Sequence, residues 1–208
     1  GKEEALARCI EMLGLVGMQE PEKWVSAYPH ELSGGMRQRV TTALALSCEP
    51  ELLLADEPTT ALDVTVQAQI LELMKDVTNR LGTAVILITH DLGVVANTCS
   101  RVLVMYGGQV VEEGPVETIF AEPQHPYTQG LLKTILDLNT GQGKKLFCID
   151  GLPPQLLCPP KGCAFASRCP RAMKVCLEQM PDFYGDDTHK ARCWLLDPEC
   201  PVKGENPW

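Results

Sequence analysis

Two short apolar runs, each ending in charged or polar side chains, constrain the fold of this chain more than any other feature. Residues 51–55 (ELLLA) and 83–90 (TAVILITH) have the continuous apolar content of strands buried in a parallel sheet. Between them, residues 65–81 place apolar side chains on one helical face, and Gly82 is a natural helix stop. This strand–helix–strand order predicts an α/β fold with a parallel sheet.

The rest of the chain divides into further helical segments and a tail of different composition. Glycines 107 and 108 lie between RVLVMY and QVVEEG and predict a β-hairpin. From Gly141 onward proline, cysteine and glycine become frequent and periodicity is weak. We therefore expect a first domain over residues 1–142, with a helical subdomain over about 1–47 and a sheet core over about 48–142, and a cysteine-rich extension over 143–208. Apolar periodicity predicts further helices near 3–13, 36–47, 91–99, 115–121 and 126–137.

Composition excludes some classes of protein. No run among the 208 residues approaches the roughly 18 apolar residues of a membrane-spanning helix. The formal net charge of −9 argues against a nucleic-acid binder, because no basic excess is present to neutralise phosphates.

The stretch ELSGGMRQRV, residues 31–40, places a serine and two glycines at the start of a predicted helix. The first N–H groups of a helix have no partner within it, and the helix dipole makes that end partially positive. Ser33 can cap the helix, while Gly34 and Gly35 allow the backbone to approach a ligand closely. The pattern fits an anion pocket built from main chain. Taken alone, it is more typical of a capped turn without a ligand.

Acidic and imidazole side chains follow the two predicted strands. Asp56 and Glu57 come at the carboxyl end of the first strand, and His90 at the end of the second. Ligands of open α/β sheets bind at that edge. Asp56 is placed to hold Mg²⁺ through water, Glu57 to orient or deprotonate an attacking water, and His90 to contact a terminal phosphate or hold the water in line. Helix capping and an ordinary turn residue are the alternatives.

Together these motifs resemble those of the ATP-binding-cassette (ABC) ATPases, over about residues 1–140. LSGGM (Leu32–Met36) resembles their signature motif and LLLADE (Leu52–Glu57) their Walker B strand with its catalytic glutamate. ALD (Ala61–Asp63) resembles their D-loop and His90 their switch histidine. The resemblance implies a P-loop NTPase fold of the ABC type with ATP and Mg²⁺ as cofactors. It assigns catalysis to Glu57 and His90, the Mg²⁺ contact to Asp56, and contact with ATP held by a second ATPase subunit to Leu32, Ser33, Gly34, Gly35, Met36 and Asp63.

The phosphate-cradling pattern G-x-x-x-x-G-K-[ST] does not occur in this sequence. We therefore expect the chain to be the C-terminal portion of a longer protein. We also expect the 208-residue chain alone to hydrolyse no ATP. Part of its apolar sheet should be uncovered, so the chain should be poorly soluble or self-associate.

Seven of the ten cysteines lie between residues 148 and 200. Cys163, Cys169, Cys176 and Cys193 have the spacing C-x₅-C-x₆-C-x₁₆-C, and four thiolates can hold one [4Fe–4S] cluster or one Zn²⁺. The spacing alone does not choose between them, and unliganded buried cysteines are the further alternative. A tail with so little apolar material would gain stability from a metal.

The tail resembles that of the dipeptide, oligopeptide and nickel importers among ABC proteins. QHPYTQGLL, GLPP and GCAFASRCPRAMKVC carry the resemblance. It implies an iron–sulfur cluster on the four cysteines named above, with Cys158 or Cys200 as possible substitutes. It further implies a peptide importer with an identical or paralogous ATPase partner, transmembrane permease subunits and indirectly a solute-binding protein. The protein would be prokaryotic and peripheral, at the cytoplasmic face of the membrane, with no nucleic acid.

The sequence also fits two other functions. One keeps the ATPase but assigns it a non-transport role, such as DNA repair or translation. The other is a metal-binding interaction module on a non-catalytic ABC scaffold. The acidic charge and the importer-like tail argue against the first, and the intact Asp56, Glu57 and His90 argue against the second.

Overall fold

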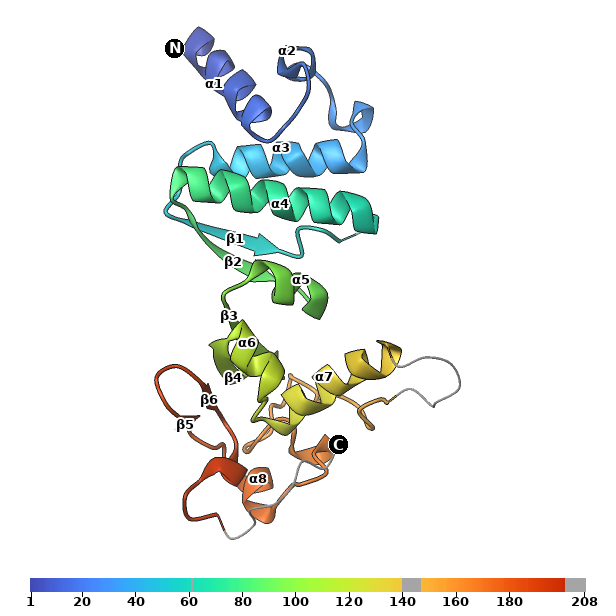
Figure 1. The fold of residues 1–208 in the computed structure, drawn as a ribbon, viewed down its shortest axis with the longest axis vertical. Helices are drawn as coiled ribbons and strands as arrows, with labels where there is room; N and C mark the ends of the chain where they lie inside the picture. The colour runs from blue at the N-terminus through green and yellow to red at the C-terminus, as the bar shows by residue number, and fades with distance from the viewer. Residues whose placement is uncertain (61, 140–146, 201–208) are drawn as a thin grey trace. The chain divides into compact units, whose positions relative to one another are not determined.

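The computed structural model describes residues 1–60, 62–139 and 147–200, which form two compact units divided between Thr98 and Cys99 (Figure 1). None of the helices in these described ranges is long and apolar enough to cross a bilayer. Each unit has its own core and its own sheet, so each is described by itself.

The first unit combines a two-stranded parallel sheet with helices. Strands β1 and β2 pair in register from Leu52 opposite Ala84 to Asp56 opposite Ile88, which confirms the predicted parallel pair. Helix α4 connects them and stops at Gly82, whose φ of +69° is the left-handed conformation that glycine adopts most easily. The elements are α1 (Lys2–Leu15), α2 (Pro21–Trp24), a 3₁₀ turn (Pro29–Glu31), α3 (Gly34–Leu46), β1 (Leu52–Asp56), α4 (Val64–Leu81), β2 (Ala84–Ile88) and α5 (Leu92–Thr98).

The core of the first unit lies between the sheet and helices α1, α3 and α4. Leu53 and Ala55 of β1 belong to this core together with Ile70 of α4. Leu54 is 64% exposed and Ile86 of β2 50% exposed. The expectation that both strands are fully buried is therefore met only by Leu53 and Ala55 of β1, and β2 has no fully buried residue.

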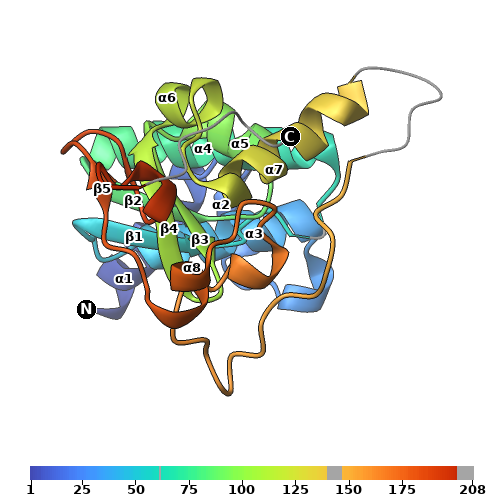
Figure 2. The same ribbon diagram turned by 90° about the horizontal axis from the view of Figure 1, so that it is seen from below.

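The second unit contains a four-stranded antiparallel sheet with strand order β3-β4-β6-β5, which the sequence did not predict as a whole. Strands β3 and β4 form an antiparallel hairpin (Figure 2). The hairpin turns at Gly107 and Gly108, whose φ angles of +57° and +77° confirm the predicted turn. The elements are β3 (Arg101–Tyr106), β4 (Gln109–Pro115), α6 (Val116–Ala121), α7 (Pro126–Asn139), a 3₁₀ turn (Ala166–Arg168), α8 (Lys174–Glu178), β5 (Tyr184–Gly185), β6 (Lys190–Ala191) and a 3₁₀ turn (Trp194–Leu196).

The predicted domain boundary at 142/143 lies outside the described residues and stays a prediction. The structure nevertheless joins segments from both sides of that boundary. Glu112 of β4 lies opposite Ala191 of β6, so the cysteine-rich tail adds strands to a sheet that begins in the preceding segment. Pairing over such a separation leaves no local periodicity for sequence reasoning to detect.

Aromatic packing anchors the cysteine-rich loop in the second unit. Phe165, which lies between Cys163 and Cys169 in the sequence, is fully buried. Its ring meets Tyr106 of β3 edge-on at 5.2 Å and Tyr127 of α7 at 5.4 Å between centroids. These contacts bring the loop, a strand and a helix together around one cluster.

Candidate functional sites

The carboxyl ends of β1 and β2 bring two of the predicted site residues into contact. Glu57 follows β1 directly, and His90 lies two residues beyond β2. The Nδ1 atom of His90 is 3.0 Å from Oε1 of Glu57. Parallel pairing of the strands explains this contact, because residues that follow adjacent parallel strands emerge at the same edge of the sheet. Asp56, the last residue of β1, is exposed beside them.

Glu57 is held in an uncommon backbone conformation. Its φ is +43°, which costs energy for a residue with a side chain. Its N–H donates to the carbonyl oxygen of Ile88 over 2.9 Å, and the Thr60 hydroxyl donates to its Oε2 over 2.7 Å. The hydrogen bond from Thr60, followed by that from His90, lowers the pKa of Glu57. Glu57 therefore remains a carboxylate with both oxygens engaged. Sequence reasoning missed Thr60, although its i+3 spacing from Glu57 was a usable signal.

The turn formed by residues 32–36, here called the Ser33 turn, leads into α3, as the sequence predicts. Ser33 Oγ accepts a hydrogen bond from the Met36 N–H over 3.3 Å, and Ser33 and Gly34 are exposed. Gly35 also has a packing role, since a Cβ there would lie 3.1 Å from Val66 Cγ1 of α4. The turn makes no hydrogen bond to Glu57 or His90 in the described structure. The capped turn exists, and its contact with a nucleotide stays a prediction.

The segment predicted as a D-loop begins at Ala61, which lies outside the described residues, and ends at the cap of α4. Asp63 Oδ1 accepts hydrogen bonds from the N–H groups of Thr65 (3.1 Å) and Val66 (3.0 Å). Asp63 thus stabilises the helix start by itself, whatever ligand it also meets. Leu32, half-buried, closes the 3₁₀ turn that precedes Ser33.

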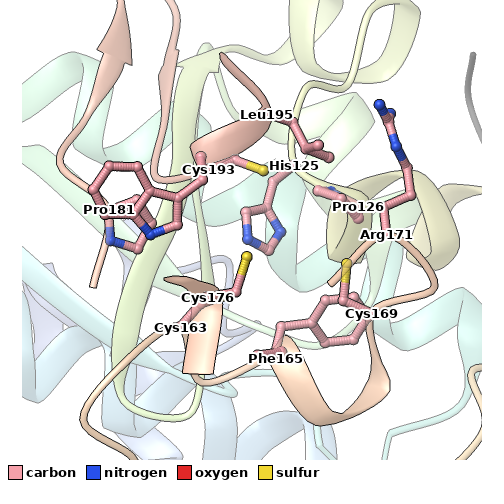
Figure 3. A pocket seen from close by; sticks show the side chains of 12 residues that line it. His125, Pro126, Cys163, Phe165, Cys169, Arg171, Cys176, Pro181, Cys193 and Leu195 are labelled. Atoms are coloured by element: carbon pink, nitrogen blue, oxygen red, sulfur yellow. The ribbon is translucent and has the colours of Figure 1, made fainter. Parts of the chain in front are cut away.

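The second unit contains a small cavity lined by all four cysteines that the sequence proposes as ligands (Figure 3). Its volume is about 20 Å³. The cysteines come from the loop before α8, from α8 itself and from the segment after β6. Of the alternatives, Cys158 is exposed, and neither it nor Cys200 lines this cavity. The lining cysteines are Cys163, Cys169, Cys176 and Cys193.

Burial disfavours the charged forms of these thiols. It raises the pKa of Cys169 to about 11 and that of Cys193 to about 12, and the neighbouring cysteines add to both increases. Thiols become thiolate ligands when a metal cation supplies compensating charge, so the donor set suits a thiophilic metal group.

A single ion and a cluster require different arrangements of the four thiols. Zn²⁺ requires all four sulfur atoms about 2.3 Å from one point. Among the described His, Cys, Asp and Glu side chains, no three converge closely enough to hold one metal ion. A [4Fe–4S] cluster binds each cysteine through a different iron atom, so its ligands surround a volume rather than a point.

His125 lines the same cavity, and sequence reasoning did not single it out. Its side chain projects among the cysteines (Figure 3) and is 1% exposed. Burial lowers its pKa to about 4, and its Nδ1 accepts a hydrogen bond from the Tyr127 N–H over 3.0 Å. The available signal was its position in HPY, directly before α7.

The backbone of His125 is held by a buried carboxylate. Glu112 of β4 is 0% exposed and accepts hydrogen bonds from the N–H groups of Gln124 (2.7 Å) and His125 (2.9 Å). Its Oε1 also lies 2.8 Å from Nε2 of His189. The two backbone hydrogen bonds fix the loop before α7 against the sheet. Together with the His189 contact they satisfy a carboxylate that would otherwise be costly to bury.

The chain is similar in sequence to known proteins in both of its units. The family model for ABC transporters matches residues 2–60, and the model for the C-terminal region of oligopeptide/dipeptide transporters matches residues 111–176. The chain is 56% identical over 201 residues to the oligopeptide transport ATP-binding protein OppD of Bacillus subtilis (strain 168), covering 96% of this chain and 56% of the relative. The chain belongs to the oligopeptide/dipeptide ABC transporter ATP-binding protein family. This membership confirms the predicted α/β fold of the ABC type.

Other relatives extend the same comparison. The chain is 53% identical to the dipeptide transport ATP-binding protein DppD of the same organism, over 94% of this chain and 58% of the relative. It is 55% identical to a probable peptide ABC transporter ATP-binding protein of Sinorhizobium fredii, over 92% of this chain and 57% of the relative. The chain thus spans more than half, but less than two thirds, of the length of these relatives. The stretch that matches the ABC transporter model includes Ser33 and Glu57, and the stretch that matches the C-terminal model ends at Cys176.

Proposed function

We propose that this chain belongs to the ATP-hydrolysing subunit of a peptide importer, in which ATP binding and hydrolysis drive transport. The observation that carries the proposal is the contact between Glu57 and His90 at the carboxyl ends of two parallel strands. The relatives named above as oligopeptide and dipeptide transport proteins support peptides as the transported class.

The Ser33 turn would bind the γ-phosphate of ATP held by a second ATPase subunit. Its exposed backbone at the start of α3 offers N–H groups and the positive end of a helix of 13 residues. Leu32, Gly34, Gly35 and Met36 form the rest of this contact, and Asp63 fixes the neighbouring α4 start. Association of two subunits, identical or paralogous, would complete each nucleotide site.

Asp56 and Glu57 would have different roles beside the phosphates of ATP. Asp56 is exposed at the end of β1, where its carboxylate could hold Mg²⁺ through water. When bound there, Mg²⁺ would neutralise part of the negative charge of the phosphates. A lowered pKa makes Glu57 a weak proton acceptor but keeps it ionised, so its role is to orient the attacking water. His90 holds that carboxylate in place through the contact at 3.0 Å.

The partners follow from this assignment. Movement of paired ATPase subunits would act on transmembrane permease subunits through the helical segment around residues 1–47, and a solute-binding protein would deliver the peptide. The protein would then lie at the cytoplasmic face of a prokaryotic membrane.

We also propose that Cys163, Cys169, Cys176 and Cys193 hold a [4Fe–4S] cluster. The four thiols that line one cavity support this assignment, because four thiolates are the ligand set of such a cluster. A structural role is favoured, since the described part of the tail has a small apolar core. Equimolar zinc without iron in anaerobically purified protein would refute the assignment.

Glu57→Gln tests the catalytic assignment. The substitution is made in a chimera that joins this chain to the part of Bacillus subtilis OppD outside its 201-residue match. ATP turnover should fall about 100-fold or more while ATP still binds, because the amide loses the charge that orients water. Glu51→Gln, at the opposite end of β1, is the matched control and should leave turnover unchanged. Equal turnover in the chimera with and without Glu57→Gln would favour a non-catalytic scaffold.

A further inference from the structure

The cysteine cavity contains an imidazole whose hydrogen-bonding role the proposed function does not use. His125 lines the cavity with the four cysteines, and its ring points among them (Figure 3). Phe165 packs against the ring at 5.9 Å between centroids, so the ring is held from one side by an apolar neighbour. A buried imidazole facing sulfur atoms is placed to interact with whatever those sulfurs bind.

The hydrogen bonds of His125 determine which nitrogen carries the proton. Nδ1 accepts a hydrogen bond from the Tyr127 N–H over 3.0 Å through its lone pair and therefore carries no hydrogen. The proton of the ring is then on Nε2. Glu112 fixes the backbone of the same residue through the His125 N–H at 2.9 Å. Both the tautomer and the position of the ring are thus set by groups outside the cavity.

Other side-chain donors at the cavity are less well placed. The Trp194 indole N–H already donates to the Gln179 carbonyl over 3.1 Å. Arg171 lines the cavity but extends away from the sulfur atoms in Figure 3. His125 is therefore the lining residue whose donor is directed toward the cysteines.

We propose that Nε2–H of His125 donates a hydrogen bond to a sulfur atom of the metal group held by Cys163, Cys169, Cys176 and Cys193. This inference rests on the proposed iron–sulfur cluster. His125 is a positioning residue and not a ligand, because its protonated Nε2 has no lone pair to offer a metal. Hydrogen bonds to the sulfurs of such a cluster favour its reduced state, which carries more negative charge.

A pair of variants separates the donor from the other contacts of this side chain. In His125→Asn, the side-chain oxygen can still accept from the Tyr127 N–H, but the amide is too short to reach the cavity. In His125→Gln, the amide nitrogen can occupy the place of Nε2. The measurement is the midpoint potential of the protein-bound cluster, titrated anaerobically with dithionite, together with iron content and circular dichroism.

The expected result is full iron content in both variants and a lower potential in His125→Asn. The equilibrium constant for one-electron reduction should fall about tenfold, equivalent to ~59 mV, and His125→Gln should restore most of this change. Full iron with an unchanged potential in His125→Asn would overturn the role of His125. A folded His125→Asn protein that has lost its iron would also overturn it, because His125 would then be a ligand.

A measurement on the unsubstituted protein covers the case in which the variants do not fold. With ¹⁵N-labelled histidine, pulsed electron paramagnetic resonance of the reduced protein should detect a weak nitrogen coupling, as expected through a hydrogen bond. A strong coupling typical of an iron–nitrogen bond, or none at all, would contradict the inference. Absence of iron from the unsubstituted protein would instead refute the proposed cluster, independently of His125.

Discussion

At the scale of single residues, the candidate ATPase site depends on how Glu57 is held. The sequence predicts the identities of Glu57 and His90 because each follows an apolar run. It does not predict the φ of +43° at Glu57 or the hydrogen bond from Thr60, since both arise from the turn that the chain makes after β1. An uncommon backbone angle in a residue with a side chain is typical of functional sites.

Replacement of Thr60 tests this local control. The Thr60 hydrogen bond is the largest cause of the lowered pKa of Glu57, so Thr60→Val should raise that pKa toward its ordinary value. Activity requires the carboxylate and is lost as pH falls through the pKa of Glu57. The acid limb of the ATP turnover profile of the chimera should therefore move to higher pH. Thr59→Val is the matched control, because the Thr59 side chain makes no hydrogen bond to Glu57 in the described structure. Identical acid limbs in the two variants would contradict the assignment.

At the scale of elements, the six longer helices and the β3–β4 hairpin were predictable, whereas the short helices α2 and α8 and the strands that complete the second sheet were not. Ser33 and Asp63 are recognisable helix caps, and the structure starts α3 and α4 directly after them. Strands β5 and β6 have two residues each, too few for any periodic signal. A glutamate such as Glu112 in QVVEEG is expected to be exposed, yet its side chain is fully buried. It is buried because His189 and the backbone N–H groups of Gln124 and His125 bind its carboxylate.

The cysteine loop depends on one close backbone approach. The Cys163 N–H donates to the Cys176 carbonyl over 2.8 Å, and a Cβ on Gly162 would lie 2.2 Å from that oxygen. Gly162→Ala should therefore separate two of the four cysteines and lower the free energy of unfolding by about 1–3 kcal/mol. Iron content and thermal denaturation measure both effects. Gly14→Ala, where no atom lies within 4 Å of the new Cβ, is the control and should retain iron. Full iron content in Gly162→Ala would contradict this account of the loop.

At the scale of the whole molecule, the chain contains two units with different chemistry. The first presents the Ser33 turn and the Glu57–His90 pair, and the second gathers four cysteines around one cavity. Sequence spacing identified the members of both sets, but only the fold shows which residues meet. The expectations that this chain alone hydrolyses no ATP and self-associates stay predictions. The exposed apolar side chains of β1 and β2 favour the second of them.

The central claim is that the Ser33 turn binds a nucleotide carried by another subunit. It is tested most directly by light scattering of the chimera carrying Glu57→Gln, with and without ATP. Ser33→Asn and Ser33→Asp both retain a side chain that can cap α3, but the aspartate places a negative charge against the γ-phosphate.

ATP should convert the Ser33→Asn protein to dimers, whereas Ser33→Asp should weaken ATP-dependent dimerisation roughly tenfold or more without weakening ATP binding by the single subunit. Equal ATP-dependent dimerisation of the two proteins would contradict the claim.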